Sequence, residues 1–311
     1  MKHIFIINPA AGKSDQTAQL TELVGAVLGR RGLDYEILVS KAPGDCTRLA
    51  KERAASGEAL RFYACGGDGT LNEVVNGLVD FDHAAVTHFP GGSGNDFIKM
   101  FDQPEAFRDL ERLLDGEEVT MDLILCETDG EIRYADNIVS MGLDARIGTS
   151  IDRYRRLPLV SGKGAYYIST VVNLLKGIHK PFVVELNGET ITGDQTLICV
   201  CNGRFYGGSF NPVPDALPDD GLLDVLIIKP VNLLQVAKVI GKYQNGQYAR
   251  YPDLIRHFRT DCIKITCFAD SVANLDGEAL HTREIVFRTV PGKLRFVCPK
   301  GVSLLTPAAA R

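Results

Sequence analysis

The stretch from Tyr63 to Leu78 reads YACGGDGTLNEVVNGL, in which an apolar run ends in two glycines. Glycines after a strand let backbone N–H groups approach an anion closely, and a helix that begins just beyond, near Thr70, adds a favourable dipole. Asp68 would repel a phosphate directly, but a Mg²⁺ ion between the two groups makes the contact favourable. The string predicts a site for phosphate and Mg²⁺. A tight turn capped by Asp68 is the structural alternative.

A second glycine-rich loop, PGGSGNDF, runs from Pro90 to Phe97 and follows the next strand-like segment. Loops after successive parallel strands emerge at the same edge of a sheet, where ligands bind. Ser93 offers a hydroxyl, Asn95 an amide for a base or ribose, and Asp96 a second carboxylate for a metal or for orienting an acceptor. We expect both loops to face one site, although two unrelated turns would also explain them.

The first turn, NPAAGKS, contains only the second half of a P-loop. The complete pattern needs a glycine at position 7, which is Ile7, so the turn is not a Walker site. Lys13 nevertheless stands at the same predicted edge and could reach a phosphate as a point charge. A solvated loop lysine fits the sequence equally well.

The elements that must position these loops alternate through the first 125 residues. The strand-like runs HIFIIN, YEILVS, LRFYAC and AAVTHFP are each followed by a loop and a helical pattern. The first helix keeps the spacing of one buried face at Leu20, Leu23, Val24, Val27 and Leu28. This rhythm predicts an α/β fold, a doubly wound parallel sheet that forms a nucleotide-binding domain over residues 1–125.

After Glu118 the pattern changes to strand-like runs joined by turns, beginning with a hairpin around residues 128–130. Helical stretches interrupt the strands near 163–178 and 232–243. We predict a β-rich sandwich domain over residues 126–292 that handles the substrate, with a tail, about 293–311, that returns to the first domain. This boundary depends on the change of rhythm alone.

The composition, 45% hydrophobic and 23% charged over 311 residues, is typical of a soluble protein with two cores. No apolar segment approaches the roughly 18 residues of a membrane span, and the N-terminus has the pattern of a first strand rather than a secretion signal. The eight cysteines lack paired zinc spacing and mostly lie in apolar runs, which predicts buried, reduced thiols. These features predict a cytoplasmic location.

The charge is unevenly distributed, with 12 Lys+Arg against 20 Asp+Glu in residues 1–125 and 22 against 19 afterwards. Residues 151–180 carry six Lys/Arg and one Asp. This segment is either a solvated face or a surface that meets anionic lipid or phosphate. The net charge of −5 and the absence of any recognisable module argue against nucleic-acid binding.

Taken together, GGDGTLNEVVNGL and PGGSGNDF resemble the bacterial diacylglycerol kinase and sphingosine-kinase-like lipid kinase family. The GGDGT element alone also occurs in NAD kinases and 6-phosphofructokinases, but Leu71–Leu78 favours the lipid branch. The segments SMGLDA, GGSFNPVPDALPDDGLLDV and LDGE follow in the family's order, so the resemblance covers nearly the whole chain. It implies a Rossmann-like N-terminal domain, as in NAD kinase and phosphofructokinase, and a C-terminal β-sandwich.

The resemblance also implies roles for individual residues. The ATP and Mg²⁺ site would comprise Asn8, Lys13, Gly66, Gly67, Asp68, Gly69, Thr70, Glu73, Gly92, Ser93, Asn95 and Asp96. Glu278 would be the catalytic base, with Asp68 and Asp276 also catalytic and Asp68 also a metal ligand. A structural Mg²⁺ would bind Asp215, Asp220 and the carbonyl of Leu222. A surface hairpin turn at 276–278 and an acidic loop without metal remain alternatives.

Two positions depart from the family's pattern. Ser93 stands where the family usually has Thr, which keeps the hydroxyl and loses the methyl group. Lys99 stands where an Arg often occurs, and a lysine cannot grip phosphate with two parallel hydrogen bonds. The second change bears on how phosphate is clamped.

The resemblance implies an ATP-dependent lipid kinase that converts diacylglycerol to phosphatidic acid in phospholipid biosynthesis. Such an enzyme would meet its lipid substrate peripherally, at the inner face of the cell membrane and without a transmembrane span. A homodimer is compatible with the sequence. A soluble-substrate kinase of the NAD kinase type, and a non-catalytic regulatory protein that binds nucleotide or lipid, remain alternative functions.

Overall fold

The computed structural model of the chain describes residues 1–143, 145–146, 179–208 and 210–306. The basic segment 151–180 therefore lies outside the described residues except for its last two, as does the helix predicted near 163–178. Contacts divide the chain into two units. Unit 1 comprises Met1–Leu123 and Pro291–Thr306, and unit 2 comprises Ile124–Val290.

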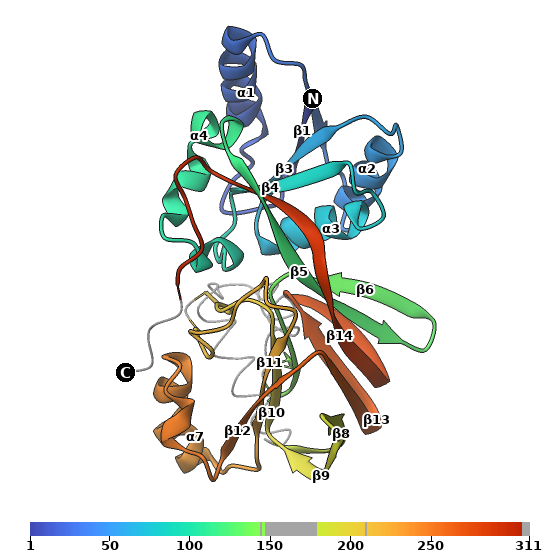
Figure 1. The fold of residues 1–311 in the computed structure, drawn as a ribbon, viewed down its shortest axis with the longest axis vertical. Coiled ribbons are helices and arrows are strands. Elements are labelled where there is room, and N and C mark those ends of the chain that lie inside the picture. Colours follow the sequence, from blue (N-terminus) through green and yellow to red (C-terminus); the bar gives the residue numbers. More distant parts are fainter. Residues whose placement is uncertain (144, 147–178, 209, 307–311) are drawn as a thin grey trace. The chain divides into compact units, whose positions relative to one another are not determined.

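Unit 1 is built on a parallel sheet with the strand order β2, β1, β3, β4 and the end of β14 (Figure 1). These strands are β1 (Lys2–Ile7), β2 (Tyr35–Val39), β3 (Leu60–Gly66), β4 (Ala84–Pro90) and β14 (Glu278–Cys298). β3 is buried along its whole length between β1 and β4. Such burial explains why its sequence is a continuous apolar run rather than an alternating one.

The helices of unit 1 follow its strands. They are α1 (Thr17–Arg31), α2 (Asp45–Ala54), α3 (Asp68–Leu78), α4 (Leu110–Leu114) and the 3₁₀ turns η1 (Phe97–Met100) and η2 (Pro104–Arg108). The predicted buried face of α1 is confirmed except at Leu23, which is 37% exposed. α3 begins at Asp68, earlier than predicted, because extended Gly67 caps it and an acidic residue is favourable in the first turn.

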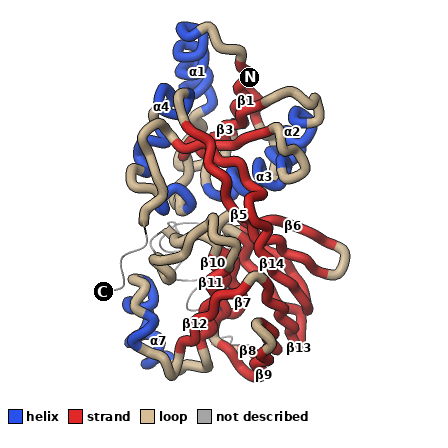
Figure 2. Tube along the Cα trace, in the orientation of Figure 1, coloured by secondary structure: helices blue, strands red, loops and turns tan. Residues whose placement is uncertain are grey.

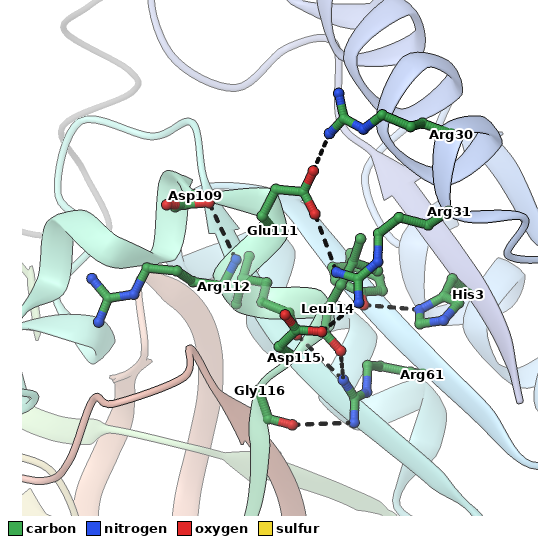
Figure 3. Close-up of polar contacts among 12 residues, drawn as sticks. His3, Arg30, Arg31, Arg61, Asp109, Glu111, Arg112, Leu114, Asp115 and Gly116 are labelled. Atoms are coloured by element: carbon green, nitrogen blue, oxygen red, sulfur yellow. Dashed lines mark hydrogen bonds and ion pairs between the residues drawn. The ribbon is translucent and has the colours of Figure 1, made fainter.

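A buried arginine fixes the C-terminal end of α4 in unit 1 (Figure 3). Arg61 is almost fully buried on β3 and donates to the carbonyls of Leu113, Leu114 and Gly116 at 3.3, 3.0 and 3.5 Å. These carbonyls carry the negative end of the helix dipole, so they suit a cation. Arg31, at the end of α1, forms ion pairs with Glu111 in α4 and with Asp115 directly after it. A buried charge with partners of this kind avoids the penalty of an unpaired ion.

Unit 2 is dominated by antiparallel strands, drawn in red in Figure 2. The central order is β12, β11, β10, β7, β13 and β14, with the β8–β9 hairpin beside β13 and β6 beside β5. The bounds are β5 (Glu117–Thr128), β6 (Glu131–Ala135), β7 (Ile138–Gly142), β8 (Lys180–Leu186), β9 (Glu189–Gln195), β10 (Leu197–Cys201), β11 (Leu223–Ile228), β12 (Ile255–Thr260) and β13 (Cys262–Leu275). One helix, α7 (Leu233–Gln244), and the 3₁₀ turn η3 (Tyr248–Arg250) accompany them.

Both faces of the central strands of unit 2 are buried. On β10, Cys199 and Cys201 belong to one apolar cluster, which also contains residues of α7, while Ile198 and Val200 belong to the other. The predicted fold class, a parallel α/β domain followed by a β-rich sandwich-like domain, is confirmed. The helix predicted near 232–243 is confirmed as α7, and all eight cysteines are free thiols.

Candidate active site

Three turns meet at the carboxyl edge of the parallel sheet in unit 1. The carbonyl of Gly66 accepts hydrogen bonds from the amides of Gly91 and Gly92 at 2.7 and 3.3 Å. A Cβ on Gly92 would lie 2.5 Å from the Cα of Gly67, and one on Gly12 would lie 2.4 Å from the carbonyl oxygen of Gly91. Because backbone meets backbone, no side chain fits at these positions. The predicted adjacency of the two glycine-rich loops is confirmed.

Two carboxylates approach the same glycine in the second loop. A Cβ on Gly94 would lie 2.9 Å from Oδ2 of Asp68 and 3.4 Å from Oδ2 of Asp96. Asp68 Oδ1 accepts from the amide of Phe97 at 3.2 Å, which ties α3 to η1. Lys99 Nζ lies 2.6 Å from Asp96 Oδ1, so this lysine pairs with a site carboxylate.

This pair of carboxylates is compatible with Mg²⁺. Magnesium in nucleotide sites is usually held by one or two carboxylates together with phosphate oxygens and water, rather than by an all-protein cage. Asp68 and Asp96 supply oxygen ligands of that kind beside the glycine loops. The arrangement needs phosphate to complete the ion's shell.

The first turn is joined to α3 by side chains. Asn8 Nδ2 donates to Thr70 Oγ1 at 3.0 Å, and Asn8 Oδ1 accepts from the amide of Ala10 at 3.0 Å. Thr70 is buried in the first turn of α3. Both residues therefore fix the backbone around the glycines.

Other predicted nucleotide residues divide into exposed and engaged groups. Lys13 and Ser93 are exposed and have no hydrogen bond or ion pair with any residue that the structure describes. Asn95, at φ +49°, accepts from the amide of Gly92 and donates to its carbonyl at 3.1 and 2.8 Å. Lys13 and Ser93 are thus available to a ligand, while Asn95 closes its own loop.

Glu73 faces a neighbouring helix. Its carboxylate accepts from the amides of Gly44 and Cys46 at 3.0 and 3.1 Å, at the N-terminus of α2. A carboxylate there satisfies unpaired N–H groups and complements the helix dipole. The geometry gives Glu73 a structural role between α3 and α2, and its predicted place in the nucleotide site stays a prediction.

One residue of this edge was missed in the sequence. His88 is fully buried on β4, and its Nε2 lies 2.9 Å from the carbonyl oxygen of Gly66. Burial lowers the pKa of His88 to about 4, so the imidazole is neutral near pH 7 and donates its Nε2 proton to that carbonyl. The only available signal was a histidine inside the apolar run AAVTHFP.

In unit 2 the predicted base lies beside a tight hairpin turn. Asp276 and Gly277, at φ 48° and 103°, form the two-residue turn between β13 and β14, and exposed Glu278 begins β14. The carboxylate of Asp276 accepts from the three backbone amides of residues 136–138 at 2.8, 3.3 and 2.8 Å. Asp276 therefore anchors the turn that carries Glu278, and its predicted catalytic role stays a prediction.

A polar network that the sequence analysis missed extends from this anchor. Asn137 Nδ2 donates to the carbonyl of Phe205 at 2.7 Å, and Asn202 Nδ2 donates to that of Asp136 at 3.0 Å. Buried Arg204 donates to the carbonyl of Ala216 at 2.7 Å. The network links the start of β7 to the loop after β10 through contacts that no short motif encodes.

The acidic loop of unit 2 pairs with an arginine on β12. Asp220 Oδ1 accepts from the amide of Leu222 at 3.0 Å, and Asp220 Oδ2 pairs with Arg259. Burial raises the pKa of Asp220. Across the described part of the chain, no three His, Cys, Asp or Glu side chains gather as a metal site. The cation predicted at Asp215, Asp220 and Leu222 stays a prediction, and the geometry favours Arg259 as the partner of Asp220.

Two family models match the chain over separate ranges. The diacylglycerol kinase catalytic domain matches residues 2–126, and the YegS C-terminal NAD kinase beta sandwich-like domain matches residues 137–298. The second model alone covers more than half of the chain. Together they cover both glycine-rich loops and the turn that carries Glu278.

Relatives and solved structures agree with these models. A protein from Xanthomonas oryzae pv. oryzae named "Probable lipid kinase YegS-like" is 31% identical, with 94% of this chain and 96% of that protein covered. A "Diacylglycerol kinase" from Staphylococcus carnosus is 26% identical, with 88% of this chain and 87% of that protein covered. A crystal structure described as that of a putative diacylglycerol kinase from Bacillus anthracis str. Sterne superposes with a TM-score of 0.75. The sequences are 25% identical, and the match covers 97% of this chain and 98% of that chain.

A parallel α/β domain that matches a kinase catalytic domain, followed by a sandwich-like domain, defines the class as a two-domain kinase. The chain belongs to the YegS-like and diacylglycerol kinase family of lipid kinases. Membership makes it a phosphotransferase family protein and implies the use of ATP. No helix among the described residues has the length and apolarity needed to cross a bilayer.

Proposed function

We propose that the protein transfers the γ-phosphoryl group of ATP to a lipid hydroxyl, with diacylglycerol as the acceptor and phosphatidic acid as the product. The observation that carries this proposal is the meeting of the two glycine loops. Backbone crowding excludes side chains there, and two carboxylates approach Gly94 beside the N-terminus of α3. This combination suits a triphosphate with its metal ion better than any neutral ligand.

In this proposal unit 1 binds and orients the nucleotide. The loop amides and the N-terminus of α3 interact with phosphate oxygens, and exposed Lys13 adds a positive charge. Asp68 and Asp96 hold Mg²⁺, which neutralises charge on the phosphates when it is bound. His88 and Asn8 keep the loop backbone in place through Gly66 and Thr70.

Glu278 acts as the general base in unit 2. It accepts the proton of the lipid hydroxyl as the oxygen bonds to the γ-phosphorus, while the bond to the β-phosphate oxygen breaks and ADP leaves. Asp276 holds the turn so that the Glu278 carboxylate is presented from the start of β14. A carboxylate in this role needs a fixed direction, because phosphoryl transfer depends mainly on positioning.

Diacylglycerol is the proposed acceptor because the name of the Staphylococcus carnosus relative and the first family model both specify it. Other lipid alcohols, such as a sphingoid base or an acylglycerol, carry the same reacting group. The proposed location is the inner face of the cell membrane, where the protein would meet its substrate peripherally.

Labelled ATP, Mg²⁺ and the purified protein should be incubated with diacylglycerol, a sphingoid base, an acylglycerol and NAD in separate detergent-dispersed reactions. We expect label in phosphatidic acid. Label in another lipid would identify that lipid, instead of diacylglycerol, as the acceptor. Label in NADP would overturn the proposal that the acceptor is a lipid. ATP binding without transfer to any acceptor would identify a regulatory protein instead.

A further inference from the structure

Helix α7 of unit 2 forms as a well-capped helix with one buried side. Asn232 and Gln235 exchange hydrogen bonds as a capping box, each side chain bonding the other's backbone amide. Val239 and Tyr243 enter the apolar cluster that covers β10 and β11. Tertiary packing therefore uses only this side of the helix.

The other side of α7 is apolar and exposed. Leu234, Leu233 and Ile240 are 83%, 56% and 44% exposed, and exposed Ala237 lies between them on the helix. Positions 233, 237 and 240 share one face because they are three and four residues apart. Three of the nine large hydrophobic side chains exposed among the described residues thus lie on one helix. Figure 1 places α7 at the margin of its unit.

The segment of sequence that contains this helix carries charge of one sign. Between Val225 and Pro252 the chain has no Asp or Glu, but it has Lys229, Lys238, Lys242 and Arg250. None of these four forms an ion pair within the part of the chain that the structure describes. The whole chain carries a net charge of −5, so this segment is a local exception.

Apolar side chains on one helix face with lysines beside them are typical of a helix that lies in a membrane interface. We infer that α7 docks the protein on an anionic bilayer, with Leu233, Leu234 and Ile240 at the boundary between head groups and acyl chains. Lys238 and Lys242 contact lipid phosphates. This inference builds on the proposed lipid kinase function and specifies the surface that brings the enzyme to its substrate.

A second copy of the chain is a less suitable occupant of this face. A symmetric dimer through α7 would place the same lysines near each other without an acidic partner in the segment. Stable protein interfaces also use aromatic and Arg anchors at their centre, whereas this face presents Leu, Ala and Ile. Charge complementarity therefore favours an anionic lipid surface.

The chain contains no tryptophan, which allows a direct test. Leu234→Trp places a single tryptophan fluorophore on α7, and Ile132→Trp places one at the exposed control position on β6. Both full-length variants are titrated with vesicles of phosphatidylcholine alone and of phosphatidylcholine mixed with phosphatidylglycerol. We expect a blue shift, and quenching by acyl-brominated lipid, only for Leu234→Trp with the anionic vesicles.

Co-sedimentation of variants without the fluorophore completes the test. Leu234→Gln should lower the partition coefficient about tenfold. Lys238→Glu should lower it about tenfold on anionic vesicles only. The matched controls Ile132→Gln and Lys51→Glu, at exposed positions, should bind like wild type. Equal binding by Leu234→Gln, or an α7-dependent change in oligomeric mass without lipid, would overturn the inference.

The two proposals can fail separately. The protein could phosphorylate diacylglycerol in detergent micelles while α7 variants bind vesicles like wild type. That result would support the kinase function and contradict the docking role of α7. Vesicle binding through α7 with no transfer to any acceptor would retain the docking surface and remove the kinase. Leu234→Gln should keep its activity on micellar lipid, because α7 contributes no residue to the candidate active site.

Discussion

The two regions proposed for catalysis are built by different means. In unit 1 the glycine loops are held together by their backbone, since carbonyls and amides hydrogen-bond across the loops and close backbone contacts exclude side chains. In unit 2 one side chain, Asp276, holds three backbone amides about 140 residues away in the sequence. The loops of unit 1 require consecutive glycines in the sequence. The turn of unit 2 requires only one acidic residue, Asp276, close to the three amides in the folded chain.

The sharpest test of this comparison is Glu278→Gln. We expect kcat to fall by about 10²–10⁴-fold, because general-base assistance is typically worth that much. ATP affinity should stay close to that of wild type, since the nucleotide loops belong to unit 1. Steady-state kinetics together with ATP titration measure both quantities. Retained turnover would remove Glu278 from the role of base.

Gly92→Ala probes the backbone contacts between the loops of unit 1. Its Cβ would meet the Cα of Gly67 at 2.5 Å, so the two loops must separate, at a cost of about 1–3 kcal/mol. We expect ATP affinity to weaken by about ten- to a hundredfold, measured by calorimetry. Gly29→Ala in α1, where nothing lies within 4 Å, is the matched control and should bind ATP normally. Wild-type affinity in Gly92→Ala would show that the loops do not cradle phosphate.

Asp276→Asn probes the turn of unit 2. An amide oxygen accepts these hydrogen bonds less strongly than a carboxylate, so the free energy of unfolding should fall by about 1–3 kcal/mol. The turn that holds Glu278 would loosen, and we expect kcat to fall while ATP affinity is unchanged. Denaturant unfolding and kinetics check both effects. A changed ATP affinity with normal kcat would contradict the positioning role.

The smallest expected effect concerns pH. The folded-state pKa of His88, about 4, lies below the ordinary value of 6.5, so the unfolded chain binds more protons between these values. Stability is therefore complete above about pH 6.5 and falls as pH decreases toward 4, by about 1 kcal/mol between about pH 7 and pH 5.5. His3, whose pKa burial also lowers to about 4, contributes in the same direction.

His88→Gln should remove the His88 part of this pH dependence. A glutamine cannot take up the proton, so the slope of unfolding free energy against pH should become shallower, while His3 keeps its share. Thermal or urea unfolding across this pH range measures the slope. An unchanged slope would show that His88 binds protons equally in the folded and unfolded states, which would contradict the lowered pKa.

Most of the fold followed from patterns that are local in the sequence. The βαβ rhythm, the buried face of α1 and the presence of a helix at GGDGT all reflect backbone geometry over a few residues, although α3 starts within that string, at Asp68. Leu23 was the exception, because spacing shows which face a residue shares but not how far the neighbouring elements cover it. Helix α7 shows the same limit, since its capping is local but its exposed apolar side is a tertiary fact.

By itself the sequence determined the parallel and β-rich halves, the glycine-rich loops and the acidic turn at LDGE, because these depend on residue types that particular backbone conformations require. Only the tertiary structure decided what each polar side chain contacts. In the structure Glu73 hydrogen-bonds to the N-terminus of α2, Asp276 hydrogen-bonds to the start of β7, and Arg259 pairs with Asp220. His88 is buried and hydrogen-bonds to the carbonyl of Gly66. A carboxylate or an imidazole is compatible with many partners, and the partner depends on which distant strands fold against it.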